Sequence, residues 1–363
     1  INYCPNRLSG NRRSHRLGFA AQCVEIKTDL LMALSESGKN SPDPQTVPPK
    51  VAVVIPSYKV SRHIIGVVDG IGPECHAIYV IDDGCPEKSG KLIAENINSD
   101  RVTVLYNETN QGVGGAVMTG YRQAMADGAD IIVKVDGDGQ MNPALINKLI
   151  GPIISGVADY CKGNRFYNPS DLREMPKIRL VGNALLSFMT KVSSGYWNSF
   201  DPTNGFTAIH AKVAEQLPME KIAKRYFFES DMLFHLNVMR AVVSDFPMSA
   251  KYGDEVSNLK IMNVIGEFLC RNISNTFKRI IYSYFLRNFS VASIEVVLGP
   301  LLILFGAVFG GYQWWLSSST GVTATTGSVM IAALPIIVGM QLFLSFLNFD
   351  ILNVPREPLH PRL

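Results

Sequence analysis

The fold follows from the stretch Ile131-Ile-Val-Lys-Val-Asp136-Gly-Asp138-Gly-Gln140, in which a run of β-branched residues ends abruptly in two carboxylates. Such a run is typical of a buried strand, and the glycines allow the backbone to turn sharply where the strand ends. Open α/β sheets bind ligands at the carboxyl ends of their strands. Mg²⁺ and Mn²⁺ bind through carboxylates plus substrate phosphates, so Asp136 and Asp138 are candidate metal ligands. A solvated Asp-Gly turn is the alternative.

Composition limits the classes of function. The 363 residues are ample for a sizeable core in one large domain or two smaller ones. The net charge of +3 provides no global field for nucleic acid, so no nucleic-acid partner is expected. The six cysteines show no Cys-x-x-Cys pair and no metal-like spacing with histidine. This usage predicts reduced thiols in a cytosolic compartment, and no signal peptide is expected.

The C-terminal part of the sequence predicts a membrane hairpin. No Asp, Glu, Lys or Arg occurs between Glu295 and Asp350. The apolar blocks at residues 296–316 and 329–347 are each long enough to cross ~30 Å of hydrocarbon as a helix. The adjacent Trp314 and Trp315 suit an interfacial anchor. Two buried helices of a soluble domain are the alternative, but soluble domains rarely run so far without a charge.

The flanking charges predict the topology of this hairpin. Basic residues lie before the first block and after the second, and the loop between the blocks has none: Arg271, Lys278, Arg279, Arg287, Arg356 and Arg362. By the positive-inside rule, the catalytic domain and both termini are cytoplasmic and the hairpin loop faces the other side. The sequence therefore predicts a multi-pass membrane protein with two spans.

The first part of the chain predicts an α/β domain. Residues 1–49 form a basic N-terminal extension that ends in a Pro-rich linker, and membrane-surface contact, subunit contact and packing on the main domain are open roles for it. Strand-like runs then alternate with helix-length segments such as residues 112–127. These runs are residues 51–55, 78–81, 102–105 and 131–135. The alternation predicts a Rossmann-like, mostly parallel sheet covered by helices on both faces.

An amphipathic stretch leads into the hairpin. Within residues 261–287, apolar side chains recur three or four positions apart, and polar ones lie off that stripe. This pattern favours one or two helices in the membrane interface. An ordinary helix that packs on the domain is the alternative.

Several motifs stand in one order along the sequence. They are Val51-Ala-Val-Val-Ile-Pro56-Ser-Tyr58, Val80-Ile-Asp82-Asp83-Gly84, Asn110-Gln-Gly112-Val-Gly114-Gly115-Ala116, Asp136-Gly-Asp138-Gly-Gln140, Gly163-Asn-Arg165 and Asp201-Pro-Thr-Asn-Gly205-Phe. In this order they resemble family 2 glycosyltransferases with the GT-A fold. More narrowly, they resemble the polyprenyl-phosphate glycosyltransferases, the group of dolichol-phosphate mannose synthase and the bactoprenol glucosyltransferases.

The resemblance implies a domain organisation. The expected parts are an extension and linker (residues 1–49), a GT-A domain (50–253), juxtamembrane amphipathic helices (254–289), a transmembrane hairpin (290–353) and a cytoplasmic tail (354–363). Members of the group also imply a homo-oligomer, with a tetramer as the expected state.

The resemblance also implies site residues. The expected donor-binding residues are Pro56, Tyr58, Asp82, Asp83, Gly112, Gly115, Asp136 and Gln140. Asp136 and Asp138 would hold Mg²⁺ or Mn²⁺ against the diphosphate. The expected catalytic residues are Asp136, Asp138, Arg165, Asp201, Glu229 and Asp231. The last two lie where related transferases carry an acidic base.

The chain departs from the family pattern in its first loop. The family usually has Pro-x-Tyr-Asn-Glu, whereas this chain has Pro56-Ser-Tyr58-Lys59-Val60, so the expected carboxylate is absent. Cys85 replaces the usual serine after Asp-Asp-Gly. No Gln-x-x-Arg-Trp motif occurs, which argues against a processive polysaccharide synthase.

The chemistry expected of these residues is an inverting transfer of a sugar from a UDP- or GDP-sugar to a polyprenyl phosphate. A phosphate monoester, with a second pKa of ~6, is largely dianionic at cytosolic pH and needs no strong base. Arginine matches phosphate oxygens bidentately, so Arg165 and then Arg179 are candidate acceptor ligands, with Lys162 and Lys177 as weaker ones. UDP-glucose is the expected donor by analogy with two-span members of the group.

Two other functions remain open. The first is transfer to another lipid hydroxyl, such as that of a diacylglycerol, which needs a base and would make Glu229 or Asp231 essential. The second is a non-catalytic, membrane-anchored nucleotide-sugar binder, which the altered Lys59-Val60 loop keeps open and the intact Asp136 and Asp138 pair argues against.

Overall fold

The computed structural model describes residues 48–167, 177–248 and 261–363. The expected extension, residues 1–49, lies almost wholly outside the described residues, as does the expected domain boundary at residues 253 and 254. The division into domains along the sequence therefore stays a prediction.

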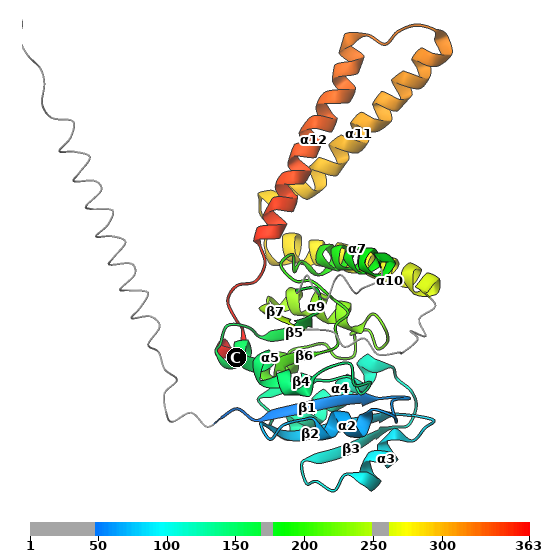
Figure 1. The fold of residues 1–363 in the computed structure, drawn as a ribbon. Helices are drawn as coiled ribbons and strands as arrows, with labels where there is room; N and C mark the ends of the chain where they lie inside the picture. Colours follow the sequence, from blue (N-terminus) through cyan, green and yellow to red (C-terminus); the bar gives the residue numbers. More distant parts are fainter. Residues whose placement is uncertain (1–47, 168–176, 249–260) are drawn as a thin grey trace, which may run out of the picture. The chain divides into compact units, whose positions relative to one another are not determined.

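A seven-stranded sheet forms the centre of the α/β region (Figure 1). Its strands are β1 (Val51–Ser57), β2 (Cys75–Asp83), β3 (Val102–Asn107), β4 (Ile131–Lys134), β5 (Tyr160–Asn164), β6 (Thr207–His210) and β7 (Val243–Pro247). Their order is β3-β2-β1-β4-β6-β5-β7, and β6 alone runs antiparallel to its neighbours β4 and β5. The expectation of a mostly parallel sheet is confirmed.

Helices cover both faces of this sheet because its strands are apolar on both sides. Along β1, Val54 belongs to a core shared with α4 (Val113–Ala126) and α9 (Phe228–Met239), whereas Val53 belongs to a core shared with α2 (Ile64–Asp69) and α5 (Ile146–Ile154). Within the described residues, the remaining helices of this region are α3 (Ser89–Asn96), η1 (Pro143–Leu145), α7 (Lys177–Ser194) and α8 (Ala211–Glu215).

The strand registers bring the ends of several strands to one edge. Ser57 at the end of β1 pairs with Asp82 in β2, and Lys134 at the end of β4 pairs with Thr207. Thr207 is the first residue of β6. Because β6 runs antiparallel to β4 and β5, this first residue lies beside the ends of both strands, and it also pairs with Lys162 in β5. The loops that follow β1, β2, β4 and β5 and the loop that precedes β6 therefore meet at this edge, which we call the site edge.

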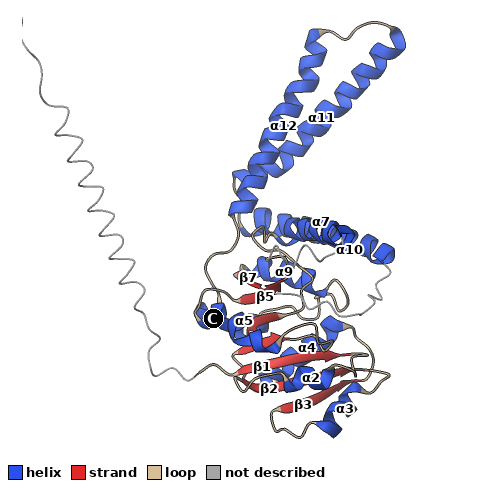
Figure 2. Cartoon of the chain, in the orientation of Figure 1, coloured by secondary structure: helices blue, strands red, loops and turns tan. Residues whose placement is uncertain are grey.

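The C-terminal region is helical in the described part of the chain (Figure 2). It comprises α10 (Ile261–Ile281), the π-helical turn η2 (Tyr282–Arg287), α11 (Val291–Thr320), α12 (Thr326–Leu352) and η3 (His360–Arg362). The expected amphipathic stretch is one continuous helix. Helices α11 and α12 are both long and apolar enough to cross a membrane, and both are longer than the apolar blocks suggested.

Helices α11 and α12 pack closely against each other. A Cβ atom at Gly299 would lie 3.0 Å from the Gly339 carbonyl, and one at Gly306 would lie 2.5 Å from the Ala332 carbonyl. These glycines let the two backbones approach. The single carboxylate near the start of α11, that of Glu295, accepts a hydrogen bond of 2.8 Å from the Ser345 hydroxyl in α12.

A buried ion pair joins the base of the hairpin to the helices beside it. Arg279 in α10 donates to both oxygens of Asp350 in α12, at 2.6 and 2.9 Å. The Tyr284 hydroxyl and the Trp197 indole N–H also donate to this carboxylate. Gly195 makes room for the guanidinium, because a Cβ there would lie 2.8 Å from Arg279 Nη1. We call Arg279, Asp350, Tyr284 and Trp197 the hairpin joint.

The expected tail, residues 354–363, contacts the sheet. The main-chain N–H groups of Leu359 and His360 donate to the buried Asp159 carboxylate, at 2.8 and 2.9 Å. The His360 ring lies 2.8 Å from the same carboxylate and stacks on His210, with 4.4 Å between the ring centroids. Asp159 precedes β5, so the tail docks at the end of the sheet opposite the site edge.

Candidate active site

The two carboxylates that end β2 hold the loops around them. Asp82 accepts main-chain hydrogen bonds of 2.7 Å from Cys85 and from Gly90. Asp83 accepts from the main chains of Gln111 and Gly112, at 3.0 and 2.8 Å. Both side chains are at least 95% buried. The structure therefore places both predicted donor-binding carboxylates at the site edge, where they shape the loops that line it.

The glycine-rich segment forms the start of α4 beside Asp83. Gly112 has φ +84°, a left-handed conformation that favours glycine. The N–H groups of Gly114 and Gly115 donate to the Lys224 carbonyl, which ties this segment to the loop before α9. The donor-binding role of Gly112 and Gly115 stays a prediction.

The altered first loop is held by the altered cysteine. Lys59 has φ +58°, and its N–H donates to Cys85 Sγ at 3.1 Å. Burial raises the pKa of this thiol, but hydrogen bonds from Ser89 and Lys59 outweigh burial and lower it. Tyr58, which lies in the same loop two residues after Pro56, is 40% exposed. The two departures from the family pattern therefore contact each other.

The Asp-x-Asp pair follows β4 as expected, but a lysine that the sequence interpretation missed pairs with it. Lys134 is 1% exposed, and its Nζ lies 2.7 Å from Asp136 Oδ1 and 3.1 Å from Glu229 Oε1. The main-chain N–H of Gln140 donates to Asp138 Oδ1 at 3.0 Å, which closes the turn around Gly139. A charged residue inside an otherwise apolar strand was the signal that could have identified Lys134.

The electrostatics of this cluster keep Lys134 charged. Burial disfavours the charged ammonium, but Asp136 and Glu229 outweigh burial and raise the pKa of Lys134. Burial raises the pKa of Glu229, as does Asp136, against the opposing effect of Lys134. Gly205 leaves room for the cluster, because a Cβ there would lie 2.1 Å from Asp136 Oδ2. The predicted residues Asp136 and Glu229 are thus brought together.

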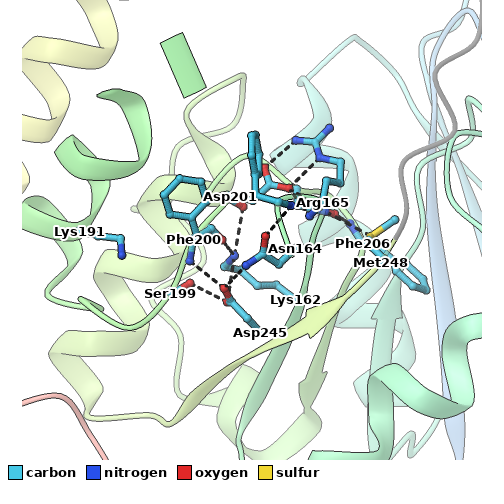
Figure 3. Close-up of polar contacts among 12 residues, drawn as sticks. Lys162, Asn164, Arg165, Lys191, Ser199, Phe200, Asp201, Phe206, Asp245 and Met248 are labelled. Atoms are coloured by element: carbon cyan, nitrogen blue, oxygen red, sulfur yellow. Dashed lines mark hydrogen bonds and ion pairs between the residues drawn. The ribbon is translucent and has the colours of Figure 1, made fainter. Parts of the chain in front are cut away.

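The predicted acceptor side of the site edge, which includes Arg165, is built around Asp201 (Figure 3). The Arg165 side chain donates to both oxygens of Asp201, each bond being 2.7 Å long. Asp201 is 2% exposed, and although burial raises its pKa, Arg165 outweighs burial and lowers it. The structure therefore brings two of the predicted site residues, Arg165 and Asp201, into direct contact.

A second ion pair, next to the loop that contains Asp201, was not predicted from the sequence. Lys162 Nζ lies 3.1 Å from Asp245 Oδ1 and donates to the Phe200 carbonyl, and Lys162 is 1% exposed. Asp245 also accepts from Asn164 Nδ2 and from the Ser199 hydroxyl, at 3.0 and 2.8 Å. Lys162, a weaker candidate for the acceptor phosphate, is therefore a buried partner of Asp245. No sequence motif indicated this role for Asp245.

The other predicted residues have separate environments. The side chains of Lys177 and Arg179 lie outside the described part of the structure, so their role as acceptor ligands stays a prediction. Asp231 accepts from the Ala223 main chain at 2.7 Å and from Asn275 Nδ2 at 2.8 Å, and it thereby links α9 to α10. Its catalytic role likewise stays a prediction.

Comparisons with known proteins agree with this arrangement. The model of glycosyl transferase family 2 matches residues 53–217. The UDP-N-acetylglucosamine–dolichyl-phosphate N-acetylglucosaminyltransferase of Methanococcus voltae is 32% identical over 216 residues, which cover 56% of this chain and 86% of that protein. The polyprenol monophosphomannose synthase of Mycolicibacterium smegmatis is 30% identical over 198 residues, which cover 52% of this chain and 74% of that protein.

A solved structure shares a more distant likeness. Glucosyl-3-phosphoglycerate synthase from Mycobacterium tuberculosis, in complex with Mn²⁺, UDP and glucosyl-3-phosphoglycerate, has a TM-score of 0.46 and 19% identity, covering 64% of this chain and 80% of that one. The family match and the two relatives, each aligned over most of its own length, decide the assignment. The expected GT-A class is confirmed, and the chain belongs to glycosyl transferase family 2.

Proposed function

We propose that this glycosyltransferase moves a sugar from a nucleoside-diphosphate donor to the phosphate of a polyprenyl phosphate at a membrane surface. One observation carries the proposal. A carboxylate pair suited to a metal and an arginine suited to a phosphate meet at one edge of a sheet, in a chain that continues into two apolar helices. The two relatives described above support it, because their names specify dolichyl-phosphate and polyprenol-phosphate products or acceptors.

The two carboxylates that follow β4 suit Mg²⁺ or Mn²⁺ as ligands. Asp136 and Asp138 provide hard oxygen ligands at the site edge, and such ions complete their coordination with phosphate oxygens and water. Among the described residues, no group of three or more His, Cys, Asp and Glu side chains could hold a metal ion. A metal bound to Asp136 and Asp138 would therefore need further ligands, which diphosphate oxygens can provide. When bound, the metal would neutralise the negative charge that develops on the leaving nucleoside diphosphate.

The residues of the chain then position the two substrates. The loops held by Asp82 and Asp83 orient the nucleotide. Arg165 binds the acceptor phosphate through guanidinium N–H groups and places an oxygen in line with the anomeric carbon. The phosphate is the nucleophile, and attack opposite to the leaving diphosphate inverts the anomeric configuration. With a second pKa of ~6, the acceptor is already deprotonated near neutral pH, so the chain need not supply a strong base.

Two exposed apolar rows support the membrane surface as the site of action. On α10, Leu269, Ile273, Phe277 and Ile281 are 45–63% exposed, and on α7, Val181, Leu185 and Phe188 are 57–68% exposed. The two helices pack against each other. Apolar rows of this kind suit helices that lie in the interface plane. The nearby Arg271 and Lys278 would attract anionic headgroups.

We also propose a membrane topology, a sugar donor and an oligomeric state. The distribution of Lys and Arg around α11 and α12 favours a cytoplasmic catalytic domain and cytoplasmic termini. UDP-glucose is our first donor, and the names of the relatives add UDP-N-acetylglucosamine and a mannose donor as alternatives. A homo-oligomer, with a tetramer as the expected state, completes the proposal.

A donor-by-acceptor screen tests the function. The full chain in detergent, with Mg²⁺ or Mn²⁺, is incubated with labelled UDP- or GDP-sugars and undecaprenyl phosphate. We expect a labelled prenyl-phosphate sugar that is lost by about 10³-fold in Asp138→Ala, because a metal contact contributes several kcal/mol. The matched control Asp100→Ala removes an exposed carboxylate and should keep full activity.

Two outcomes would overturn the proposal. Transfer to a diacylglycerol or ceramide hydroxyl, with none to the prenyl phosphate, would replace the acceptor and make Glu229, whose side chain is 13% exposed, the candidate base. Donor binding without transfer to any lipid, unchanged by Asp138→Ala, would favour a nucleotide-sugar binder.

A further inference from the structure

A buried ion pair on strands β5 and β7 holds the loop before β6. Lys162 and Asp245 lie on neighbouring strands, β5 and β7, with 3.1 Å between Lys162 Nζ and Asp245 Oδ1. The two side chains are 2% and 13% exposed. A pair this deeply buried is seldom a net source of stability, because desolvation offsets much of the attraction. A buried pair of this kind can instead specify one conformation.

The conformation that this pair specifies is that of residues 199–201. Asp245 Oδ2 accepts from the Phe200 N–H at 2.8 Å, and Asp245 Oδ1 accepts from the Ser199 hydroxyl. Lys162 Nζ donates to the carbonyls of Phe200 and Asp201, the latter at 3.2 Å. Main-chain donors and acceptors of this segment are thus bound by side chains of the two strands below it.

The segment ends in a residue whose backbone is strained. Asp201 has φ +57°, which is uncommon for a residue other than glycine. In this conformation the Asp201 carboxylate meets Nε and Nη2 of Arg165, and it also accepts from the Arg165 main chain at 3.1 Å. Figure 3 shows Arg165 on one side of the loop and Asp245 on the other. The orientation of the guanidinium therefore depends on the loop that the buried pair holds.

We propose that Asp245, together with Lys162, is a positioning residue for the acceptor: it holds residues 199–201 so that Asp201 aims Arg165 at the acceptor phosphate. The inference rests on the proposed function, because it takes a prenyl phosphate as the ligand of Arg165. Asp245 touches neither substrate. Its effect reaches the acceptor through two contacts, Asp245 to the loop and Asp201 to Arg165.

The test separates binding of the acceptor from binding of the donor. In Asp245→Asn, an amide N–H₂ replaces one of the two carboxylate oxygens and cannot accept a hydrogen bond, so either Ser199 or Phe200 loses its acceptor, and Lys162 loses its charged partner. The dissociation constants of farnesyl phosphate and of UDP are measured on the full chain in detergent, together with the KM for undecaprenyl phosphate. We expect the dissociation constant of farnesyl phosphate and the KM for undecaprenyl phosphate to rise by about tenfold, because a misplaced positioning group loses affinity in this range. The dissociation constant of UDP should stay unchanged.

A milder variant and a matched control keep the test decisive. Ser199→Ala removes one hydrogen bond to Asp245 and should weaken farnesyl phosphate binding by about threefold without unfolding the chain. Asp159→Asn changes a fully buried carboxylate at the other end of the same strands, which accepts from Val242, Leu359 and His360. This control should lower the melting temperature and leave the farnesyl phosphate constant unchanged.

The results separate this inference from the proposed function. If Asp245→Asn lowers stability but binds farnesyl phosphate as the parent does, the pair is only structural and the inference is wrong. If Asp245→Asn does not fold, unchanged affinity in Ser199→Ala has the same meaning. If the parent binds farnesyl phosphate but transfers no sugar, the proposed function fails while the binding comparison still decides the inference. If the parent binds no prenyl phosphate, both fail.

Discussion

The predicted donor side of the site edge, around Asp82 and Asp83, and the predicted acceptor side, around Asp201, are held by different kinds of contact. On the donor side, Asp82 and Asp83 accept hydrogen bonds mainly from main-chain N–H groups, 3 to 29 residues further along the chain. On the acceptor side, Arg165 pairs with Asp201 across 36 residues, and Asn164 binds Asp245 across 81. The predicted donor side is therefore held mainly by main-chain hydrogen bonds, whereas the predicted acceptor side also depends on ion pairs between side chains that are far apart in the sequence.

This difference has a consequence for substitutions. A main-chain N–H remains when a side chain is replaced, so a change on the donor side affects one carboxylate and its loop. On the acceptor side, the loss of one partner leaves a buried charge without its counter-ion, which is strongly destabilising. Changes on the acceptor side should therefore combine lost stability with lost acceptor binding, whereas changes on the donor side should mainly weaken donor binding.

The largest effect is expected at a third cluster made of side-chain contacts, the hairpin joint. Asp350→Asn removes the partner of the buried Arg279, and breaking such a pair costs about 3–5 kcal/mol. We expect a melting temperature about 10 °C lower, with the KM values for donor and acceptor unchanged because the joint lies outside the site edge. The measurement is thermal unfolding in detergent together with steady-state kinetics.

An exposed pair provides the control for the hairpin joint. Glu357→Gln removes the partner of Arg362, and both side chains are more than half exposed. Exposed pairs contribute little, so the melting temperature should change by less than about 1 °C. An equal drop in melting temperature in both variants would mean that burial does not determine how much the Arg279 and Asp350 pair contributes to stability.

The next effect is expected where the two sides meet. In Gly205→Ala, the added Cβ would lie 2.1 Å from Asp136 Oδ2 and 2.4 Å from Lys134 Nζ, so the carboxylate and the ammonium must move. A shift of about 1 Å in a positioned group can cost about 10²-fold in rate. We expect a loss of that size in kcat/KM for the donor, measured with labelled nucleotide sugar.

A glycine with open space is the control for Gly205. Gly151 lies inside α5, and a Cβ there would meet nothing within 4 Å. Gly151→Ala should therefore keep full activity and gain slightly in stability, because alanine favours the helix. Equal activity in the two alanine variants would show that the Asp136 and Lys134 cluster is not sensitive to its surroundings.

The same contrast explains what the sequence could predict. The first four strands, the mostly parallel sheet and the two apolar helices follow from periodicity and from runs without charges, whereas β5, β6 and β7 were not predicted. The positions of Asp82 and Asp136 at strand ends follow from local patterns as well. Lys134, by contrast, was visible only as a charge within an apolar strand, and its partner Glu229 lies 95 residues away.

The acceptor side was the harder part to predict. The pairing of Lys162 with Asp245 depends on β5 and β7 lying side by side, which follows from the sheet order and not from any local pattern. The docking of residues 359 and 360 on Asp159 likewise joins positions 200 or more apart. Contacts between distant side chains require the fold to be known first, which is why the motifs gave the donor side more completely.

A smaller effect is expected on the donor side itself. In Asp83→Asn, the amide N–H₂ replaces one of the two oxygens that accept from Gln111, Gly112 and Asn107, so at least one donor loses its acceptor. The loop before α4 should then be less well fixed. We expect the KM for the nucleotide sugar to rise by about tenfold, with the KM for undecaprenyl phosphate unchanged.

This result and that of Asp245→Asn should mirror each other. The first variant should affect the donor alone, and the second the acceptor alone. Asp130→Asn is the control for the donor side, because Asp130 accepts a main-chain hydrogen bond from Lys50 at the opposite end of the sheet. If Asp83→Asn raised both KM values equally, the two sides of the site edge would not be separable.

The smallest effect is expected at the docked tail, at the opposite end of the acceptor-side strands. Burial, and then His360 and Lys212, lower the pKa of His210 from 6.5 to about 4. The folded state therefore binds fewer protons than the unfolded state between these values, so stability present at pH 7 is lost as the pH falls from about 6.5 toward about 4. His210→Asn keeps a side chain that caps α8 and removes this titration. The drop in melting temperature between pH 7 and pH 5, measured in detergent, should be smaller in the variant by a few degrees. A larger drop in the variant than in the parent would show that protonation of His210 stabilises the stacked pair with His360.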